Sequence, residues 1–218
     1  MPQRPPLTRA RVVDAAARVA DEGGLAKVSM RNVGRELGVE AMSLYHHVKD
    51  KAALLDGLAD WIYTRIDLPE RATPWRPAMA ARAASTRGAL AAHPWSLALV
   101  DTRRVPGPHV LRHNDAVLGF LRRDGFPLPL ATHAFSAIDA YVYGFVVTEL
   151  NLPFDPAGSV DAFVDNVSAL IPAERYPYLA ELVAAHAEER GYSYAEEFEY
   201  GLDLILDSVE VRLREAGG

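Results

Sequence analysis

The chain has 218 residues, of which 50% are hydrophobic and 24% are charged, and it contains no cysteine. That length supports one large domain or two small ones with a full apolar core, which excludes intrinsic disorder, collagen-like repeats and a disulfide-stabilised secreted scaffold. The lack of cysteine also excludes thiolate catalysis, zinc–thiolate sites and iron–sulfur clusters. The first residues have no apolar export segment, and the most apolar stretch, 131–152, has no uncharged run long enough to span a bilayer. We therefore expect a soluble, cytoplasmic protein that does not contact a membrane.

Charge is divided unevenly along the chain. Residues 1–51 carry nine basic and six acidic side chains, whereas residues 52–218 carry 14 and 23, so the two parts have net charges of +3 and −9. A small basic N-terminal part on an acidic body is typical of a DNA-binding head with a separate sensing or oligomerising part. The alternative is chance, since many two-part proteins show a split of this size.

Helical periodicity recurs along almost the whole chain, and no alternating strand pattern or internal repeat is found. The predicted fold class is therefore all-α, with an N-terminal helix-turn-helix head and a larger helical body. A proline-containing break at 68–77 predicts a domain boundary between 1–67 and 68–218. The expected helices cover about 8–22, 29–38, 41–47, 50–62, 78–93, 95–100, 109–124, 128–152, 160–170, 176–190 and 195–215.

Residues 28–51 are predicted to form two short helices joined by Leu37-Gly38-Val39-Glu40. Thr8, Ser29 and Asp50 are the expected N-caps of the helices in this part of the chain. Gly38 allows the positive φ that a sharp helix exit needs, and Val39 supplies an apolar plug for the turn. This pattern predicts a helix-turn-helix, whose second helix enters the major groove of DNA.

Four motifs carry a family resemblance: Val12-Val13-Asp14-Ala15-Ala16, Ser29-Met30-Arg31, Leu37-Gly38-Val39, and the run from Leu44 to Leu55, LYHHVKDKAALL. In these motifs the sequence resembles the tetracycline-repressor (TetR) family of bacterial regulators over about residues 8–60. The body resembles the tetracycline-repressor type of C-terminal domain more weakly, at Gly125-Phe126 and Tyr143-Gly144-Phe145. The resemblance implies a DNA-binding head and a C-terminal body that pairs across a two-fold axis.

Eight residues of the head are candidate DNA contacts. Ser43 suits a base edge and Met42 a thymine methyl, whereas the Tyr45 hydroxyl suits a phosphate and Arg31 reaches either. Lys51, at the start of a helix, is expected to form a phosphate clamp with backbone N–H groups. The alternatives are that Tyr45 packs in the core, that the histidines are solvated, and that Arg31 pairs with an acidic neighbour. The candidates are Arg31, Ala41, Met42, Ser43, Tyr45, His46, His47 and Lys51.

One head makes too few base contacts for useful specificity, so a homodimer on a palindromic, double-stranded DNA operator is expected. The last expected helix carries an apolar stripe at helical spacing. The resemblance implies that this helix and an earlier one form a four-helix bundle with a second copy, and the alternative is that the stripe packs only on its own chain. The stripe consists of Phe198, Leu202, Ile205, Val209 and Leu213.

The helix over 128–152 is apolar nearly all round, which predicts a central position in the body. Asp139 and Glu149 interrupt it, and buried carboxylates are costly unless they are paired or face a cavity. Aromatic and polar residues of neighbouring elements complete a candidate pocket for a medium-sized, partly polar organic effector. The candidate ligand contacts are Trp95, Asp101, Arg104, His113, Asn114, Val117, Phe135, Asp139 and Tyr143. Each of them taken alone is also an ordinary core or surface residue.

No metal or other cofactor is expected. The resemblance raises tetracycline with magnesium as an effector, but Asp101 occupies the position of a metal-binding histidine of the founding member, so tetracycline itself is not expected. Asp101 with Glu149 could still hold a hard cation through oxygen or water. Another antibiotic, a polyketide or aromatic metabolite, and a fatty-acyl compound are the alternative effectors.

The expected function is a ligand-responsive transcriptional regulator, in the default case a repressor that its effector releases from DNA. An effector that binds the off-DNA state more tightly by ~1–3 kcal/mol weakens the free energy of operator binding by the same amount. No catalytic residues are expected, because the chain has no nucleophile elbow, dinucleotide fingerprint, P-loop or His-Glu-x-x-His motif. An activator and a helical protein-interaction module are the alternatives, and the second predicts no steep salt dependence of DNA binding.

Overall fold

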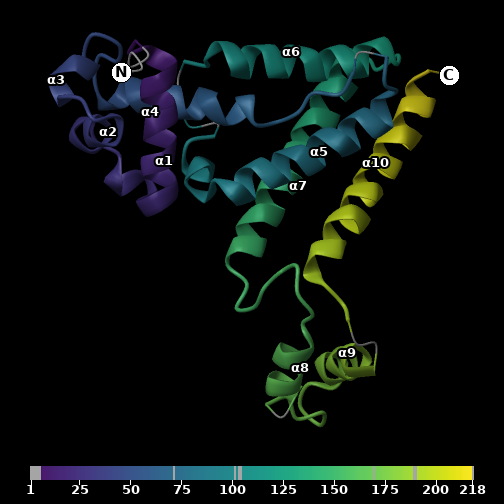
Figure 1. Cartoon of the computed structure of the whole chain (residues 1–218). Coiled ribbons are helices and arrows are strands. Elements are labelled where there is room, and N and C mark those ends of the chain that lie inside the picture. The colour runs from purple at the N-terminus through teal and green to yellow at the C-terminus, as the bar shows by residue number, and fades with distance from the viewer. Residues whose placement is uncertain are drawn as a thin grey trace. The chain divides into compact units, whose positions relative to one another are not determined.

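A computed structural model describes residues 6–70, 72–100, 102, 105–168, 170–188 and 191–217. In these ranges the chain forms α-helices and short 3-10 helices and no strand (Figure 1), which confirms the all-α fold class. Its contacts divide it into two compact units, one up to Phe135 and one from Ser136 onward. The predicted domain boundary at 67/68 lies inside the first unit, and it stays a prediction.

Short helices build the N-terminal part of the first unit. Three side chains cap them as expected, because Thr8, Ser29 and Asp50 each accept the backbone N–H of the residue three positions on, at 3.3, 3.2 and 2.8 Å. Helix α1 packs on both α2 and α4, and α2 packs on α3. The bounds are α1 Arg9–Lys27, α2 Met30–Leu37, α3 Ala41–Leu44, α4 Lys51–Trp61 and η1 Ile62–Thr64.

Two of these helices end differently from the prediction. Helix α1 continues to Lys27 through a kink, because Gly24 takes a φ of 69° that a glycine adopts without strain. Helix α3 ends at Leu44, and His47 N–H bonds to the Leu44 carbonyl in the turn that follows. Gly38 has the expected positive φ, 63°, and ends α2.

The rest of the first unit consists of α5 (Trp75–Ala92), η2 (Pro94–Ala98), α6 (Pro108–Arg123) and the first turns of α7 (Leu128–Leu150). Helix α5 begins three residues earlier than expected, because the Asp124 carboxylate accepts the Trp75 N–H at 2.6 Å. The first turn of α5 contains a proline, Pro77. Proline is tolerated there, because the N–H that it lacks would be unpaired in a first helical turn anyway.

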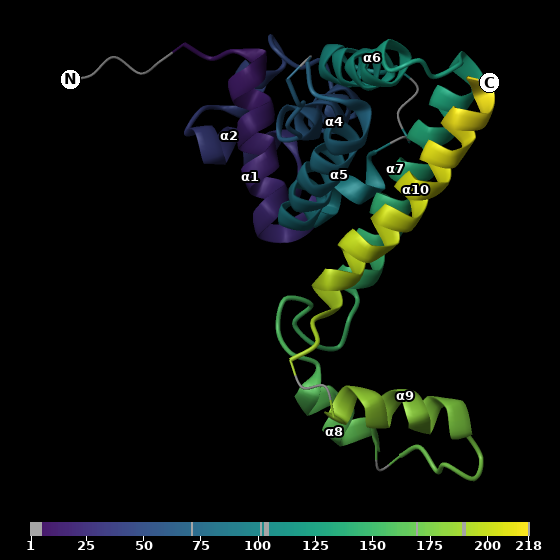
Figure 2. The ribbon, with the colours of Figure 1, turned by 90° about the vertical axis from the view of Figure 1, so that its right-hand side faces the viewer.

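The second unit contains the end of α7 together with α8 (Asp161–Ser168), α9 (Pro177–Glu188), η3 (Tyr194–Glu196) and α10 (Glu197–Ala216). Its core is aromatic: the ring of Phe198 lies 5.6 Å from that of Tyr141 and 5.1 Å from that of Phe145. Figure 2 shows α9 beside α8, and these two helices pack on each other. By length and composition α7 is apolar enough to cross a membrane, although carboxylates interrupt its long uncharged runs.

Candidate nucleic-acid interface and effector pocket

The helix-turn-helix presents the expected DNA-contact residues at its surface. Leu44 is fully buried and Val48 is 2% exposed, and together they anchor α3 and its following turn in the core of the head. Met42 and Tyr45 are 74% and 47% exposed, so the structure does not support a core position for the Tyr45 ring. Of the other candidates, Arg31, His46 and Lys51 are exposed, and Ala41, Ser43 and His47 are half-buried.

The two cationic candidates are not engaged in ion pairs within the described ranges. Glu36 pairs instead with Arg18, at 2.6 Å from Oε1 to Nε, and the Asp50 carboxylate caps α4. Both acidic neighbours that could have neutralised Arg31 therefore have other partners. Lys51 is the first residue of α4, where the positive end of the helix dipole adds to its charge. This arrangement suits contacts to phosphate groups.

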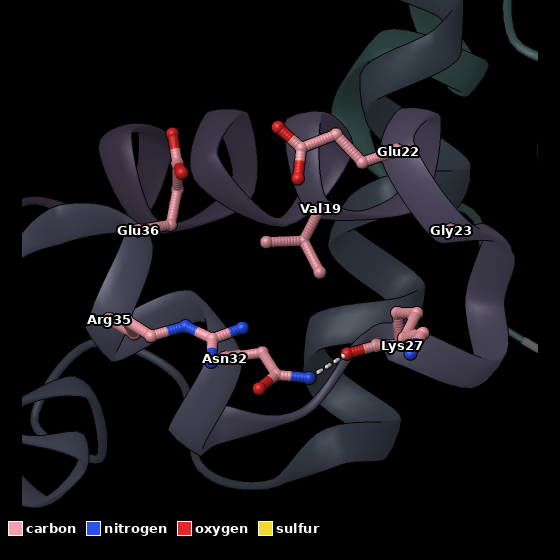
Figure 3. Close-up of a pocket in the computed structure, with 7 residues that line it drawn as sticks. All are labelled: Val19, Glu22, Gly23, Lys27, Asn32, Arg35 and Glu36. Carbon is pink, nitrogen blue, oxygen red and sulfur yellow. Dashed lines mark hydrogen bonds between the residues drawn. The ribbon is translucent and has the colours of Figure 1, made fainter.

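One hollow on the surface of the head is unsuited to binding DNA. It has a volume of about 330 Å³ and lies between α1 and α2 (Figure 3). Glu22 and Glu36 lie on one side, and Lys27 and Arg35 lie on the other. The Asn32 amide already donates to the Lys27 carbonyl at 2.7 Å. The mixed charges cancel, so the hollow offers no positive surface to a phosphate.

Within the first unit, the expected ligand residue His113 forms a buried pair with Arg82. Arg82 and His113 are each 1% exposed, and Arg82 Nε donates to His113 Nε2 at 2.8 Å. Burial and, to a smaller extent, the guanidinium lower the pKa of His113 to about 3. His113 is thus neutral and carries its proton on Nδ1, as assigned from the hydrogen bond. That buried N–H has no hydrogen-bond partner in the described part of the chain.

Aromatic rings surround this pair. The Arg82 guanidinium lies 5.0 Å from the centre of the Phe135 ring, and the Tyr63 ring meets His113 edge-on with ring centres 5.2 Å apart. Val117 lies one turn beyond His113 on α6 and is fully buried. Of the expected ligand residues, His113 and Phe135 therefore lie together at Arg82, and Tyr63 packs beside them.

Arg82 was detectable in the sequence by its register. It falls on the apolar stripe of α5, where its neighbours at helical spacing are all buried. A charged residue at such a position is costly to bury unless it is paired or serves a site. The buried residues of this stripe are Trp75, Ala78, Met79, Arg82, Ala83, Thr86, Ala89 and Leu90.

Two other expected ligand residues of the first unit have different surroundings. Asn114 lines a separate hollow of about 220 Å³ together with Tyr63 and residues of α4. Trp95 is 7% exposed, and its indole N–H is already bonded to Asp21. Asp139 and Tyr143 lie in the part of α7 that belongs to the second unit. Asp101 and Arg104 lie outside the described residues.

The buried His113 makes stability depend on pH. Between its ordinary pKa of 6.5 and its folded value of about 3, the unfolded chain binds a proton that the folded chain does not bind. The stabilising contribution is complete above pH 6.5 and is lost progressively as the pH falls below that value. We expect acidification from about pH 6.5 to about pH 5 to remove roughly 2 kcal/mol through this residue.

Thermal unfolding of His113→Gln at these two pH values checks this expectation. Glutamine keeps an acceptor for Arg82 but does not titrate, so the variant should lose less stability on acidification than the wild type. His133→Gln is the matched control, because His133 is exposed on α7. Equal losses in the His113 variant and the wild type would contradict the expectation.

A three-helix head with an exposed second helix of the turn motif defines a helix-turn-helix DNA-binding protein. The sequence signature of "Bacterial regulatory proteins, tetR family" matches residues 12–58, and that of "Tetracyclin repressor-like, C-terminal domain" matches residues 68–213. The chain therefore belongs to the tetR family, and it is a ligand-responsive, DNA-binding transcriptional repressor. The family resemblance inferred from the motifs is confirmed, and the family consists of transcription regulators, not enzymes.

Similar proteins match over nearly the whole chain. The HTH-type transcriptional repressor DrrR1 of Streptomyces coeruleorubidus is 33% identical over 99% of this chain and 82% of its own. The tetracycline repressor protein class D of Escherichia coli is 29% identical, over 95% and 91%. The crystal structure of apo ActR from Streptomyces coelicolor has a TM-score of 0.78 and 25% identity, over 98% of this chain and all of ActR.

Proposed function

We propose that this chain acts in the cytoplasm as a homodimer that binds a palindromic operator and is released from it by a small organic effector. The observation that carries the DNA-binding part is the exposed turn motif with Arg31 and Lys51 outside any ion pair in the described ranges. We assign DNA binding to residues 1–67, and effector binding and dimerisation to 68–218. The two matched signatures lie on either side of this boundary, at 12–58 and 68–213.

Exposed apolar faces support the dimer. Phe198, Leu202 and Val209 of the predicted stripe are at most 6% exposed within one chain. The apolar surface of α10 that remains open to a second copy is therefore the face next to this stripe. That face carries Tyr200, Leu204 and Val211, which are 67%, 57% and 48% exposed. In the most apolar window of α7 only 33% of the residues are buried in the chain. Such faces are typical of surfaces that a second copy covers.

The Arg82–His113 pair supports an effector with acceptor oxygens. A buried N–H donor without a partner costs free energy, and an effector oxygen placed against His113 Nδ1 would recover that cost. Phe135 and Tyr63 are the aromatic side chains that pack against this pair, and an aromatic effector would contact them there. ActR, similar over 96% of this chain, has been crystallised in complex with actinorhodin. We propose that the effector is a medium-sized aromatic compound that carries carbonyl or acidic oxygens.

Selection of bound sequences from random DNA duplexes tests this function. The full chain should enrich a palindrome whose half-sites lie about 10 base pairs apart, one helical turn. Addition of aromatic and antibiotic compounds to the best duplex should then identify one that releases the protein. The variant His113→Gln should bind the same duplex with unchanged affinity but respond less to that compound. No enrichment at low salt would contradict DNA binding and would favour a protein-interaction module.

A further inference from the structure

One carboxylate of α1 joins the head to the elements that follow residue 67. Asp21 Oδ1 accepts the indole N–H of Trp95 at 2.6 Å and lies 2.7 Å from Nδ1 of His93. His93 follows the last residue of α5, and Trp95 belongs to η2. The side chains of His93 and Asp21 are 20% and 35% exposed, so this junction is partly shielded from water. All three residues belong to the first compact unit.

Aromatic packing extends the junction to the end of α4. The Trp61 ring meets His93 edge-on, with ring centres 4.9 Å apart, and lies 6.0 Å from the Trp95 ring. Trp61 Nε1 also donates to Asp14 Oδ1 at 2.7 Å, one further contact between α4 and α1. Directional hydrogen bonds and packed rings at a single point restrict rotation of α1 relative to η2.

We propose that Asp21 is a positioning residue that sets the orientation of each head, and thereby the half-site spacing that the dimer accepts. The inference rests on the proposed binding of a palindrome by a dimer. Asp21 makes none of the expected base or phosphate contacts, which all come from residues 31–51. Its loss should therefore leave binding of a single half-site intact. The loss of Asp21 should change only how strongly the dimer discriminates between operators with different half-site spacings.

Dimers read half-sites at a fixed separation because both recognition helices must enter the major groove together. One added or removed base pair between half-sites changes both their distance and their rotation about the DNA axis. A head held by Asp21 cannot follow that change without breaking the bonds to Trp95 and His93. A head released from them can turn, so an operator of altered spacing is penalised less.

The test uses the full-length chain and the palindrome selected from random duplexes. Fluorescence anisotropy measures its affinity for that palindrome, for versions with one base pair added or removed at the centre, and for a single half-site. We expect the wild type to lose at least about tenfold in affinity on altered spacing. Asp21→Ala should reduce this discrimination several-fold and leave single half-site binding unchanged. Asp21→Asn keeps an acceptor for Trp95 and should give an intermediate result.

Glu22→Ala is the matched control, because Glu22 is the adjacent exposed carboxylate and its removal changes the charge equally. It should keep the wild-type spacing profile. An unchanged profile in Asp21→Ala and Asp21→Asn would overturn the inference, as would a wild type that accepts all spacings equally. Equal loss of single half-site binding in both Asp21 variants would assign Asp21 to head folding instead. Failure of the proposed function would give a different result, because the wild type would then enrich no palindrome from random duplexes.

Discussion

Gly107→Ala is expected to lower the free energy of unfolding by at least about 2 kcal/mol. A Cβ at this position would lie 2.2 Å from Cγ and 2.3 Å from Oδ1 of Asp60. Asp60 is 8% exposed, and its Oδ1 accepts the N–H groups of His109 and Val110 at 2.9 and 3.1 Å. The carboxylate cannot move aside without breaking this cap of α6. Gly107 itself has an ordinary φ of −79°, so the cost comes from the close approach and not from backbone strain.

Urea denaturation of matched variants checks this prediction. Gly88→Ala adds the same methyl group to the interior of α5, where a Cβ meets nothing within 4 Å, and should stabilise the chain by about 0.5–1 kcal/mol. Asp60→Ala combined with Gly107→Ala should cost less than the sum of the two single changes, because the first removes the atoms that the new methyl meets. Similar stabilities for Gly107→Ala and Gly88→Ala would contradict the close approach.

Lys51→Glu is expected to lower the affinity for the operator and for unrelated duplexes alike, by at least about 100-fold near 0.1 M salt. In the proposed dimer two expected phosphate contacts would be lost, and two carboxylates would face the DNA backbone. The slope of log affinity against log salt should become shallower by about two, since each lost phosphate contact removes about one released counterion. Lys51 is exposed at the first residue of α4, so its replacement should leave folding unaffected.

Two other variants separate charge from sequence reading. Arg175→Glu makes the same charge change in the segment before α9, where the guanidinium lies over its neighbour Tyr176, and should leave DNA affinity unchanged. Ser43→Ala should alter the preferred operator sequence and keep the salt slope. Titrations of both duplexes at several salt concentrations measure these effects. Unchanged affinity and slope in Lys51→Glu would show that this end of α4 does not contact phosphate.

Local signals in the sequence predicted the head well. Caps and glycine turns act within three or four residues, so Ser29, Asp50 and Gly38 indicate helix ends that the structure confirms. The motif from Leu44 to Leu55 also indicates the family, which the matched signature confirms. Periodicity shows which residues of α10 are apolar, but it does not show which side of the helix the chain covers itself. Phe198 and Leu202 pack inside the chain, and Tyr200 remains exposed.

The sequence by itself determined the fold class, the turn motif and the family. All of these depend on local patterns of capping, turn chemistry and helical spacing. Only the tertiary structure decided which distant side chains meet. Arg82 and His113 are 31 positions apart, Asp60 and His109 are 49 apart, and Asp21 and Trp95 are 74 apart. Such pairs follow from helix packing and the resulting exclusion of water, which no short stretch of sequence encodes.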